Sequence, residues 1–336
     1  MTVPKKGVVA KKGVVAETHE EDEFEGPEAG DETQAAVTTV QESLAARPRF
    51  VETPSLKSIA DRALTYAENG LPLHFRGPTG CGKTTLALHV AEQLGRPVML
   101  ISGDDEFATS DLVGSEHGYT RKRTIDNYIH SVMKTEDRLD YTWVDARLTV
   151  ACQEGYTLIY DEFNRSRPEA NNILLPVLGE GILILPIVKT TRGYVRVHPQ
   201  FTAIFTSNPK EYAGVHSSQD ALLDRMITMD LGHFDSETEI AITQAHAGLT
   251  RKRAQIIVDL IRRLRQSGNG SCDPTVRSCI MIGRIMARQS KNGNGSNPTF
   301  EQVCADVLTR VLSPAGQPDK QGTKIVNDLI AASRWS

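Results

Sequence analysis

Eight consecutive residues of this sequence fit the pattern G-x-x-x-x-G-K-[ST] at every fixed position. In such a run the glycines let backbone N–H groups turn inward around the α- and β-phosphates of a nucleoside triphosphate. The lysine, here Lys83, reaches the β- and γ-phosphates, and the last hydroxyl, here that of Thr84, faces Mg²⁺. A glycine-rich turn with an incidental Lys-Thr pair is the alternative. The residues expected at the nucleotide are Gly77, Pro78, Thr79, Gly80, Cys81, Gly82, Lys83, Thr84 and Thr85.

Two adjacent carboxylates, Asp161 and Glu162, follow the apolar run Leu158-Ile159-Tyr160. In an open parallel sheet, the carboxyl ends of the strands face the ligand crevice. We therefore expect Asp161 to lie beside the Mg²⁺ bound through Thr84, and Glu162 to orient and polarise the attacking water. A pair of surface acids is the alternative.

A polar amide ends a third apolar segment, Phe205-Thr206-Ser207-Asn208-Pro209. From the next strand over, Asn208 would contact the γ-phosphate or the attacking water. Taken alone, an asparagine before a proline is more typical of a turn. Together with the two preceding motifs it is predicted to be functional.

The elements that must position these residues alternate between strands and helices. Apolar, β-rich segments of strand length alternate with helical patterns, one of them over residues 53–67 with Thr53 as N-cap and another from Thr85. This alternation indicates an α/β fold with a parallel sheet covered on both faces. Residues 104–123 are predicted to be a polar loop, and from Asp235 onward only helices are expected. The predicted strands are 71–75, 97–101, 157–160, 201–206 and 226–229.

Three regions follow from this pattern: a tail over residues 1–48, an α/β nucleotide-binding domain over 49–233 and a small helical lid over 234–336. The tail begins with a tandem repeat of Lys-Lys-Gly-Val-Val-Ala and continues as an acidic stretch poor in apolar residues. Such a segment cannot bury enough surface to offset its ordering entropy, so we predict disorder. It either docks on a partner or only aids solubility.

Charge and composition exclude several classes of protein. The chain of 336 residues carries a net charge of −4, and residues 1–32 hold four lysines and nine acidic residues, so the rest is nearly neutral. A nearly neutral body argues against nucleic acid as the main partner. The longest apolar run, 182–188, is too short to span a membrane. The five scattered cysteines indicate reduced thiols in a cytoplasmic protein.

These motifs resemble those of the AAA+ ATPases, in particular the MoxR branch. The run Asp161 to Glu169 looks like the extended acidic motif of that branch, and Asn208 falls at its sensor 1. The segment Ala221 to Arg225 is similar to the one that presents the arginine finger, which implies that Arg225 acts in trans at the site of a neighbouring subunit. The segment Asp273 to Arg277 lies where relatives carry the sensor 2 arginine, often directly after a proline, but here two residues separate Pro274 from Arg277. This departure leaves the choice open between Arg277 and, with less support, Arg284.

Within that branch the chain resembles the CbbQ/NirQ/NorQ/GvpN group over about residues 50 to 330, and it looks like the group's gas vesicle ATPases. Segments that carry this likeness include 126–132, 166–175 and 207–216. The resemblance implies an ATP- and Mg²⁺-dependent ATPase that forms a homo-oligomeric ring, with six subunits expected. It would remodel gas vesicle shell or accessory proteins while vesicles grow to full width, and it would be associated with gas vesicles. The alternatives are an activase of a metabolic enzyme, as in the CbbQ and NorQ relatives, and a shell-associated structural protein that binds ATP without useful hydrolysis.

Two further segments are candidates for gripping a partner. Tyr119 and the basic triplet 121–123 lie in the predicted loop and could face the pore of a ring. Residues 181–197 are similar to a β-hairpin insertion with Arg192 and Gly193 at its turn. Packing and contacts between subunits explain these residues about equally well.

Overall fold

The computed structural model describes residues 50–126, 134–185, 193–209, 220–267, 274–289, 298–312, 324, 327–330 and 335, with the backbone alone described at 116–126, 134–143 and 309–312. The tail predicted over residues 1–48 therefore lies outside the described residues, as do most of 126–132 and much of 207–216.

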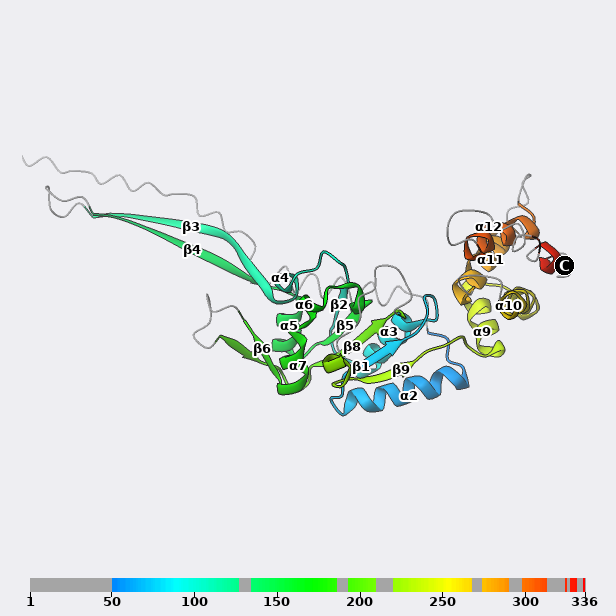
Figure 1. Ribbon diagram of the computed structural model, residues 1–336, viewed down its shortest axis with the longest axis horizontal. Coiled ribbons are helices and arrows are strands. Elements are labelled where there is room, and N and C mark those ends of the chain that lie inside the picture. Colours follow the sequence, from blue (N-terminus) through cyan, green and yellow to red (C-terminus); the bar gives the residue numbers. More distant parts are fainter. Residues whose placement is uncertain are drawn as a thin grey trace, which may run out of the picture.

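A sheet of five parallel strands forms the centre of the molecule, in the order β2-β5-β8-β1-β9 (Figure 1). All five predicted strands are present, with ends shifted by one or two residues. Both faces of the sheet are covered, because along β5 Leu158 and Tyr160 pack in one buried cluster and Ile159 packs in another. The predicted fold class is confirmed. The strands are β1 (Leu73–Arg76), β2 (Val98–Ser102), β5 (Thr157–Asp161), β8 (Thr202–Ser207) and β9 (Ile227–Asp230).

Helices cover both faces of the central sheet. On one face, α2 (Pro54–Glu68) and α3 (Lys83–Leu94) pack against β1 through alanines and leucines. Helix α2 begins where predicted, with the Thr53 hydroxyl accepting the Leu56 N–H at 3.4 Å. On the other face lie α5 (Arg147–Glu154) and α7 (Leu174–Glu180); between β5 and α7 the chain forms the short η1 (Phe163–Arg165) and α6 (Pro168–Asn171).

The polar loop predicted over residues 104–123 is wrong in its second half. The chain forms α4 (Thr109–Val113) and then β3 (Gly114–Asp126), which pairs antiparallel with β4 (Lys134–Asp145) in a separate ribbon that extends away from the central sheet (Figure 1). The sequence of β3 lacks the apolar alternation that marks a strand with one face on a core. Tyr119 and the triplet 121–123 lie on β3, and their place in a pore stays a prediction.

The hairpin predicted over residues 181–197 is confirmed as β6 (Ile182–Ile184) and β7 (Tyr194–Arg196), paired antiparallel. Arg192, expected at its turn, lies outside the described residues. Gly193 is described, and its carbonyl accepts the Leu185 N–H at 3.0 Å.

After the short α8 (Asp220–Leu223) and β9, the described chain is helical, as predicted. These helices share a buried cluster of their own, separate from the two beside the sheet. A small fourth cluster joins Leu56 of α2 to Ile242 and Val276 of this helical part. The division at residue 234 stays a prediction. The helices are α9 (Ser236–Ala247), α10 (Arg251–Gln266), α11 (Val276–Gln289) and α12 (Phe300–Leu312).

Candidate active site

The glycine-rich run forms the connection between β1 and the start of α3. Gly80 has φ +83°, a conformation that side chains rarely adopt, and a Cβ there would overlap the Thr275 hydroxyl. A Cβ at Gly77 would overlap the Leu231 carbonyl. Since α3 begins at Lys83, the loop lies at the amino end of a helix of 12 residues, where free N–H groups and the helix dipole favour an anion.

Lys83 lies across this loop and is almost fully buried. Its Nζ donates to the carbonyls of Gly77 and Pro78 and to Asn208 Oδ1, each at 2.9 Å. Burial lowers the pKa of Lys83, while the carboxylates of Asp161 and Glu162 act to raise it. The ammonium is therefore fixed among neutral oxygens of the loop, close to both carboxylates.

The two carboxylates stand at the carboxyl end of β5, as predicted. Asp161 Oδ1 accepts the hydroxyl protons of Thr84, at 2.7 Å, and of Thr206, at 2.6 Å. Because the Thr84 proton points to Asp161, the lone pairs of the Thr84 oxygen remain for a cation. These hard oxygen donors are of the kind that Mg²⁺ prefers, with phosphate and water oxygens completing its shell. Within the described residues, no cluster of three or more His, Cys, Asp or Glu offers another metal site.

Glu162 is the one non-glycine residue with positive φ among the described residues, at +52°. Its N–H donates to the Thr206 hydroxyl at 2.9 Å, which fixes this backbone. Its carboxylate accepts from Arg165 Nη1 at 2.9 Å and from Asn208 Nδ2 at 3.3 Å. Burial acts to raise the pKa of Glu162, but the hydrogen bonds from Arg165 and Asn208 outweigh it and lower the pKa. The Glu162 carboxylate is thus ionised and is fixed in place by Arg165 and Asn208.

Asn208 connects the loop lysine to the second carboxylate. Its Oδ1 faces the Lys83 ammonium and its Nδ2 faces Glu162, which is the one amide orientation that satisfies both partners. The Asn208 carbonyl accepts from Asn164 Nδ2 at 2.8 Å. The sequence motifs for Lys83, Asp161, Glu162 and Asn208 therefore meet in one place.

The two candidates for sensor 2 occupy different positions. On α11, Arg277 Cβ lies 3.5 Å from the point where a Gly80 Cβ would stand, and its charge acts to lower the pKa of Lys83. Arg284, two turns further along, instead donates through Nε to the His246 carbonyl at 3.1 Å. The geometry favours Arg277.

Arg225 lies at the opposite edge of the sheet from the phosphate loop of its own chain. It precedes β9, whose first residue Ile227 pairs with Leu73, the first residue of β1. The phosphate loop follows the last residue of β1. Arg225 donates through Nη1 to the Ala221 carbonyl at 2.6 Å and lies against Gly179. The structure therefore separates Arg225 from the other predicted site residues of its own chain.

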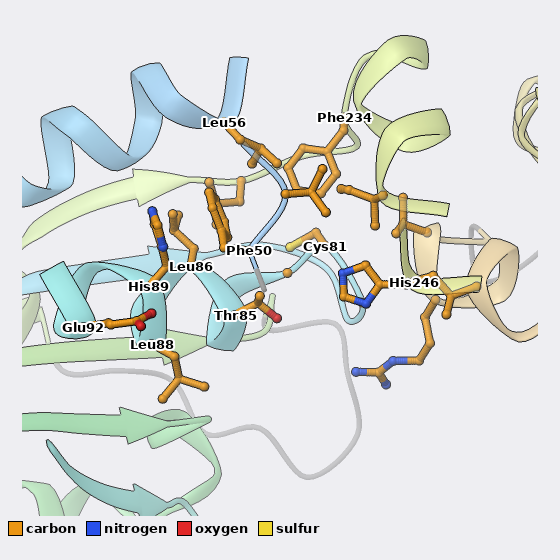
Figure 2. Close-up of a pocket in the computed structure, with 18 of the residues that line it drawn as sticks. Phe50, Leu56, Cys81, Thr85, Leu86, Leu88, His89, Glu92, Phe234 and His246 are labelled. Atoms are coloured by element: carbon orange, nitrogen blue, oxygen red, sulfur yellow. The ribbon is translucent and has the colours of Figure 1, made fainter. Parts of the chain in front are cut away.

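A pocket of about 860 Å³ extends from the phosphate loop to the helical part of the chain (Figure 2). On the sheet side it is lined by α3 and by Phe50, whose ring stacks on His89 with centroids 3.9 Å apart. On the other side lie Phe234 and His246. The pocket is mostly apolar and continuous with the phosphate loop, as a nucleoside requires.

The described cysteines are buried and form no disulfide, in agreement with the prediction of reduced thiols. Burial raises the pKa of Cys81, which lines this pocket, and raises the pKa values of Cys152, Cys279 and Cys304 to about 12. Such thiols are poor nucleophiles.

Sequence reasoning missed four residues of the site: Thr206, Arg165, Asn164 and Gly103. Thr206 and Gly103 lie at or just beyond the carboxyl ends of β8 and β2, the same edge as Asp161. Gly103 donates its N–H to the Asp161 carbonyl at 2.8 Å, and a Cβ there would overlap the Glu162 carbonyl. A search of every strand end at this edge would have found both.

Comparison with known proteins agrees with this geometry. Residues 72–226 match the family described as AAA domain (dynein-related subfamily). The chain is 49% identical over 278 residues to Gas vesicle ATPase GvpN of Ancylobacter aquaticus, covering 82% of this chain and 78% of the relative. It is 44% identical over 266 residues to Gas vesicle ATPase GvpN1 of Halobacterium salinarum, covering 79% of this chain and 74% of the relative.

The chain belongs to the GvpN family of gas vesicle ATPases. It is an ATPase of the AAA+ class, and the resemblance noted from the sequence is confirmed. Protein NorQ of Paracoccus denitrificans is a more distant relative, 29% identical over 79% of this chain and 87% of its own length. Among the described residues, no helix of the GvpN-family chain has the length and apolar character needed to cross a bilayer.

Proposed function

We propose that this chain hydrolyses ATP at sites shared between neighbouring subunits of a ring and uses the energy to remodel proteins during gas vesicle assembly and growth. The observation that carries the proposal is the connected set of Lys83, Asn208 and Glu162 beside the Thr84–Asp161 pair. The likeness to GvpN proteins supplies the setting in gas vesicles.

Each residue of this set has a distinct part in hydrolysis. Thr84 and Asp161 would hold Mg²⁺, which would supply positive charge beside the phosphates of ATP. The ammonium of Lys83 stabilises charge on the γ-phosphate, and Glu162 orients the attacking water with its carboxylate. Asn208 bonds to both Lys83 and Glu162 and so fixes the position of the attacking water relative to the γ-phosphate.

Arg225 and Arg277 complete the charge around the γ-phosphate from two sides. Arg277 approaches Gly80 within its own chain, whereas Arg225 lies against Gly179, at the amino-terminal edge of the sheet. An arginine supplied by a neighbour typically contributes about 10³–10⁵ in rate. The position of Arg225 supports a head-to-tail ring, for which six subunits is the expectation.

The pocket between the α/β part and the helical part of the chain couples ATP hydrolysis to movement of these two parts. Its lining comes both from the α/β part of the chain, through Phe50 and helix α3, and from the helical part, through His246 and Arg277. A nucleotide in this pocket contacts both halves, so loss of the γ-phosphate shifts the helical lid against the core. The client is a vesicle shell or accessory protein, and the protein acts in the cytoplasm at the vesicle.

A Glu162→Gln variant tests this proposal. Glutamine keeps the shape of the side chain and can accept one of its two hydrogen bonds, but it removes the charge, so ATP binding is retained and turnover falls by about 10²–10⁴. Cells that carry the vesicle shell genes with this variant should form vesicles that stay narrow in electron micrographs. The matched control is Glu154→Gln, on the exposed end of α5 at the opposite edge of the sheet.

Parental vesicle widths with the Glu162→Gln variant would show that hydrolysis is not the function and would favour a structural role. Normal vesicles without this chain at all would point to another client, as expected for an activase of the NorQ type. Because Glu162→Gln holds ATP, a pull-down with this variant should identify the client directly.

A further inference from the structure

The helical part of the chain buries a carboxylate that is paired with two arginines. Glu239, one turn into α9, is fully buried. Its Oε2 accepts from Arg262 Nη1 at 3.0 Å and its Oε1 accepts from Arg265 Nη2 at 2.9 Å. Burying one carboxylate costs several kcal/mol unless its partners are well placed, so a buried ion pair contributes little net stability. Its main effect here is to fix the positions of the groups that it joins.

Both arginines carry a second hydrogen bond, and both of these leave helix α10. Arg262 Nη1 also donates to the Phe234 carbonyl at 3.1 Å, and Arg265 Nε donates to the Pro274 carbonyl at 3.0 Å. Phe234 lies on the link between β9 and α9, and Pro274 lies just before α11. Glu239 therefore ties two separate backbone segments to one point.

Both of these segments lie against the phosphate loop. The ring of Phe234 comes within 3.6 Å of the point where a Gly82 Cβ would stand. The segment after Pro274 carries Thr275 and Arg277, which crowd the same point at Gly80. Figure 2 shows Phe234 on the lid side of the pocket, near Cys81 of the loop.

From this geometry we infer that Glu239 is a positioning residue for hydrolysis: through Arg262 and Arg265 it sets where Phe234 and Arg277 lie on the phosphate loop. The inference rests on the proposed role of Arg277 at the γ-phosphate. The two arginines have different consequences. Through Pro274, Arg265 positions the charge of Arg277, which acts on the reacting phosphate. Arg262 positions the ring of Phe234, which lines the nucleoside pocket.

The test uses arginine-to-lysine substitutions, which keep the positive charge beside Glu239. A lysine ammonium is a single nitrogen, so it cannot replace the Nε and Nη2 donors of Arg265 together. Its side chain is also one atom shorter, so it ends short of the Nη1 position from which Arg262 makes both of its bonds. Arg265→Lys should lower kcat about tenfold with little change in KM, because Arg277 is misplaced. Arg262→Lys should raise KM about fivefold with little change in kcat, because Phe234 is misplaced. Glu239→Gln should show both effects. Arg263→Lys, on the exposed face of the same helix, is the matched control and should match the parent.

A double-mutant cycle separates positioning from plain stabilisation. If Arg265 acts through Arg277, then Arg265→Lys should change kcat less than about twofold in an Arg277→Ala background, since the group it positions is gone. Effects that multiply would overturn the inference, as would an Arg265→Lys enzyme with parental kcat. Thermal unfolding of each variant identifies any that fails to fold; if Arg265→Lys fails, the KM of Arg262→Lys decides.

Failure of this inference differs from failure of the proposed function. Glu162→Gln is measured in the same assay. If that variant loses turnover while Arg265→Lys keeps it, the site stands and the role of Glu239 is refuted. If Glu162→Gln keeps full turnover, the proposed function itself is refuted.

Discussion

Replacing Thr206 by valine should lower both ATP turnover and the stability of the fold. The Thr206 side chain is fully buried on β8. Its hydroxyl donates to Asp161 Oδ1 at 2.6 Å and accepts the Glu162 N–H at 2.9 Å. Valine keeps the shape of threonine and removes both bonds, so Asp161 loses one of its two hydroxyl donors and Glu162 loses the bond that fixes its backbone.

The magnitude follows from these two bonds. A hydrogen bond to a charged group contributes about 1.5–3 kcal/mol, and a buried N–H left without a partner costs about 1–3 kcal/mol. Asp161 keeps Thr84 and is only half-buried, so the lower ends of these ranges apply and the folded protein loses about 2.5 kcal/mol. If about 1.5–2.5 kcal/mol of this loss is felt in the transition state, kcat falls about 10- to 70-fold.

ATP turnover measured against Mg²⁺ concentration, together with urea unfolding, checks both numbers. Thr206→Ser keeps the hydroxyl and should retain most activity. The matched control is Thr157→Val at the other end of β5, because the buried Thr157 hydroxyl has no hydrogen-bond partner in the part of the chain that the structure describes. A Thr206→Val enzyme within twofold of the parent at every Mg²⁺ concentration would refute the reasoning. So would equal damage from Thr157→Val.

Two further predictions concern assembly and pH. Arg225→Ala should bind ATP without hydrolysing it. Mixing this variant with Lys83→Ala should restore part of the activity, because some subunit interfaces then combine an intact phosphate loop with an intact arginine. If rings form but no mixing ratio restores activity, Arg225 does not act in trans. Burial, with Arg76 nearby, lowers the pKa of His74 to about 4, from 6.5 in the unfolded chain. The unfolded chain thus binds this proton first on acidification, so the contribution of His74 to the free energy of unfolding should fall by about 1.4 kcal/mol per pH unit from pH 6.5 to 4 and be constant above 6.5. Urea unfolding should show a shallower acid slope for His74→Gln, and equal slopes would contradict the assignment.

The central sheet and the residues at its carboxyl edge were predictable because one rule covers them. Strands of a parallel sheet end at the same edge, so a loop after one strand and polar residues after two others must meet. Lys83, Asp161, Glu162 and Asn208 do meet, although up to 125 positions separate the bonded residues. Their motifs carry the signal locally, and no knowledge of contacts was needed.

Residues that act by positioning other side chains have no sequence motif of this kind. Thr206 is an ordinary threonine in a β-rich run, and Glu239 is an acid in the first turns of a helix, where acids are common for capping alone. Their roles depend on partners across the fold, 45 positions away for Thr206 and Asp161 and 26 for Glu239 and Arg265. The β3–β4 ribbon was missed for another reason: its strands form a separate two-stranded sheet that extends away from the central sheet (Figure 1), and their sequence lacks the apolar alternation by which strands are predicted.

The backbone of Glu162 has a consequence for laboratory evolution. A non-glycine residue in the left-handed region costs on the order of 1 kcal/mol, and asparagine and glycine tolerate that region better than glutamate does. A library of this chain selected for heat resistance alone should therefore accumulate Asn or Gly at position 162 and lose its carboxylate. Thermostability and turnover oppose each other at this residue, so any screen for a sturdier enzyme has to score ATP consumption alongside melting temperature.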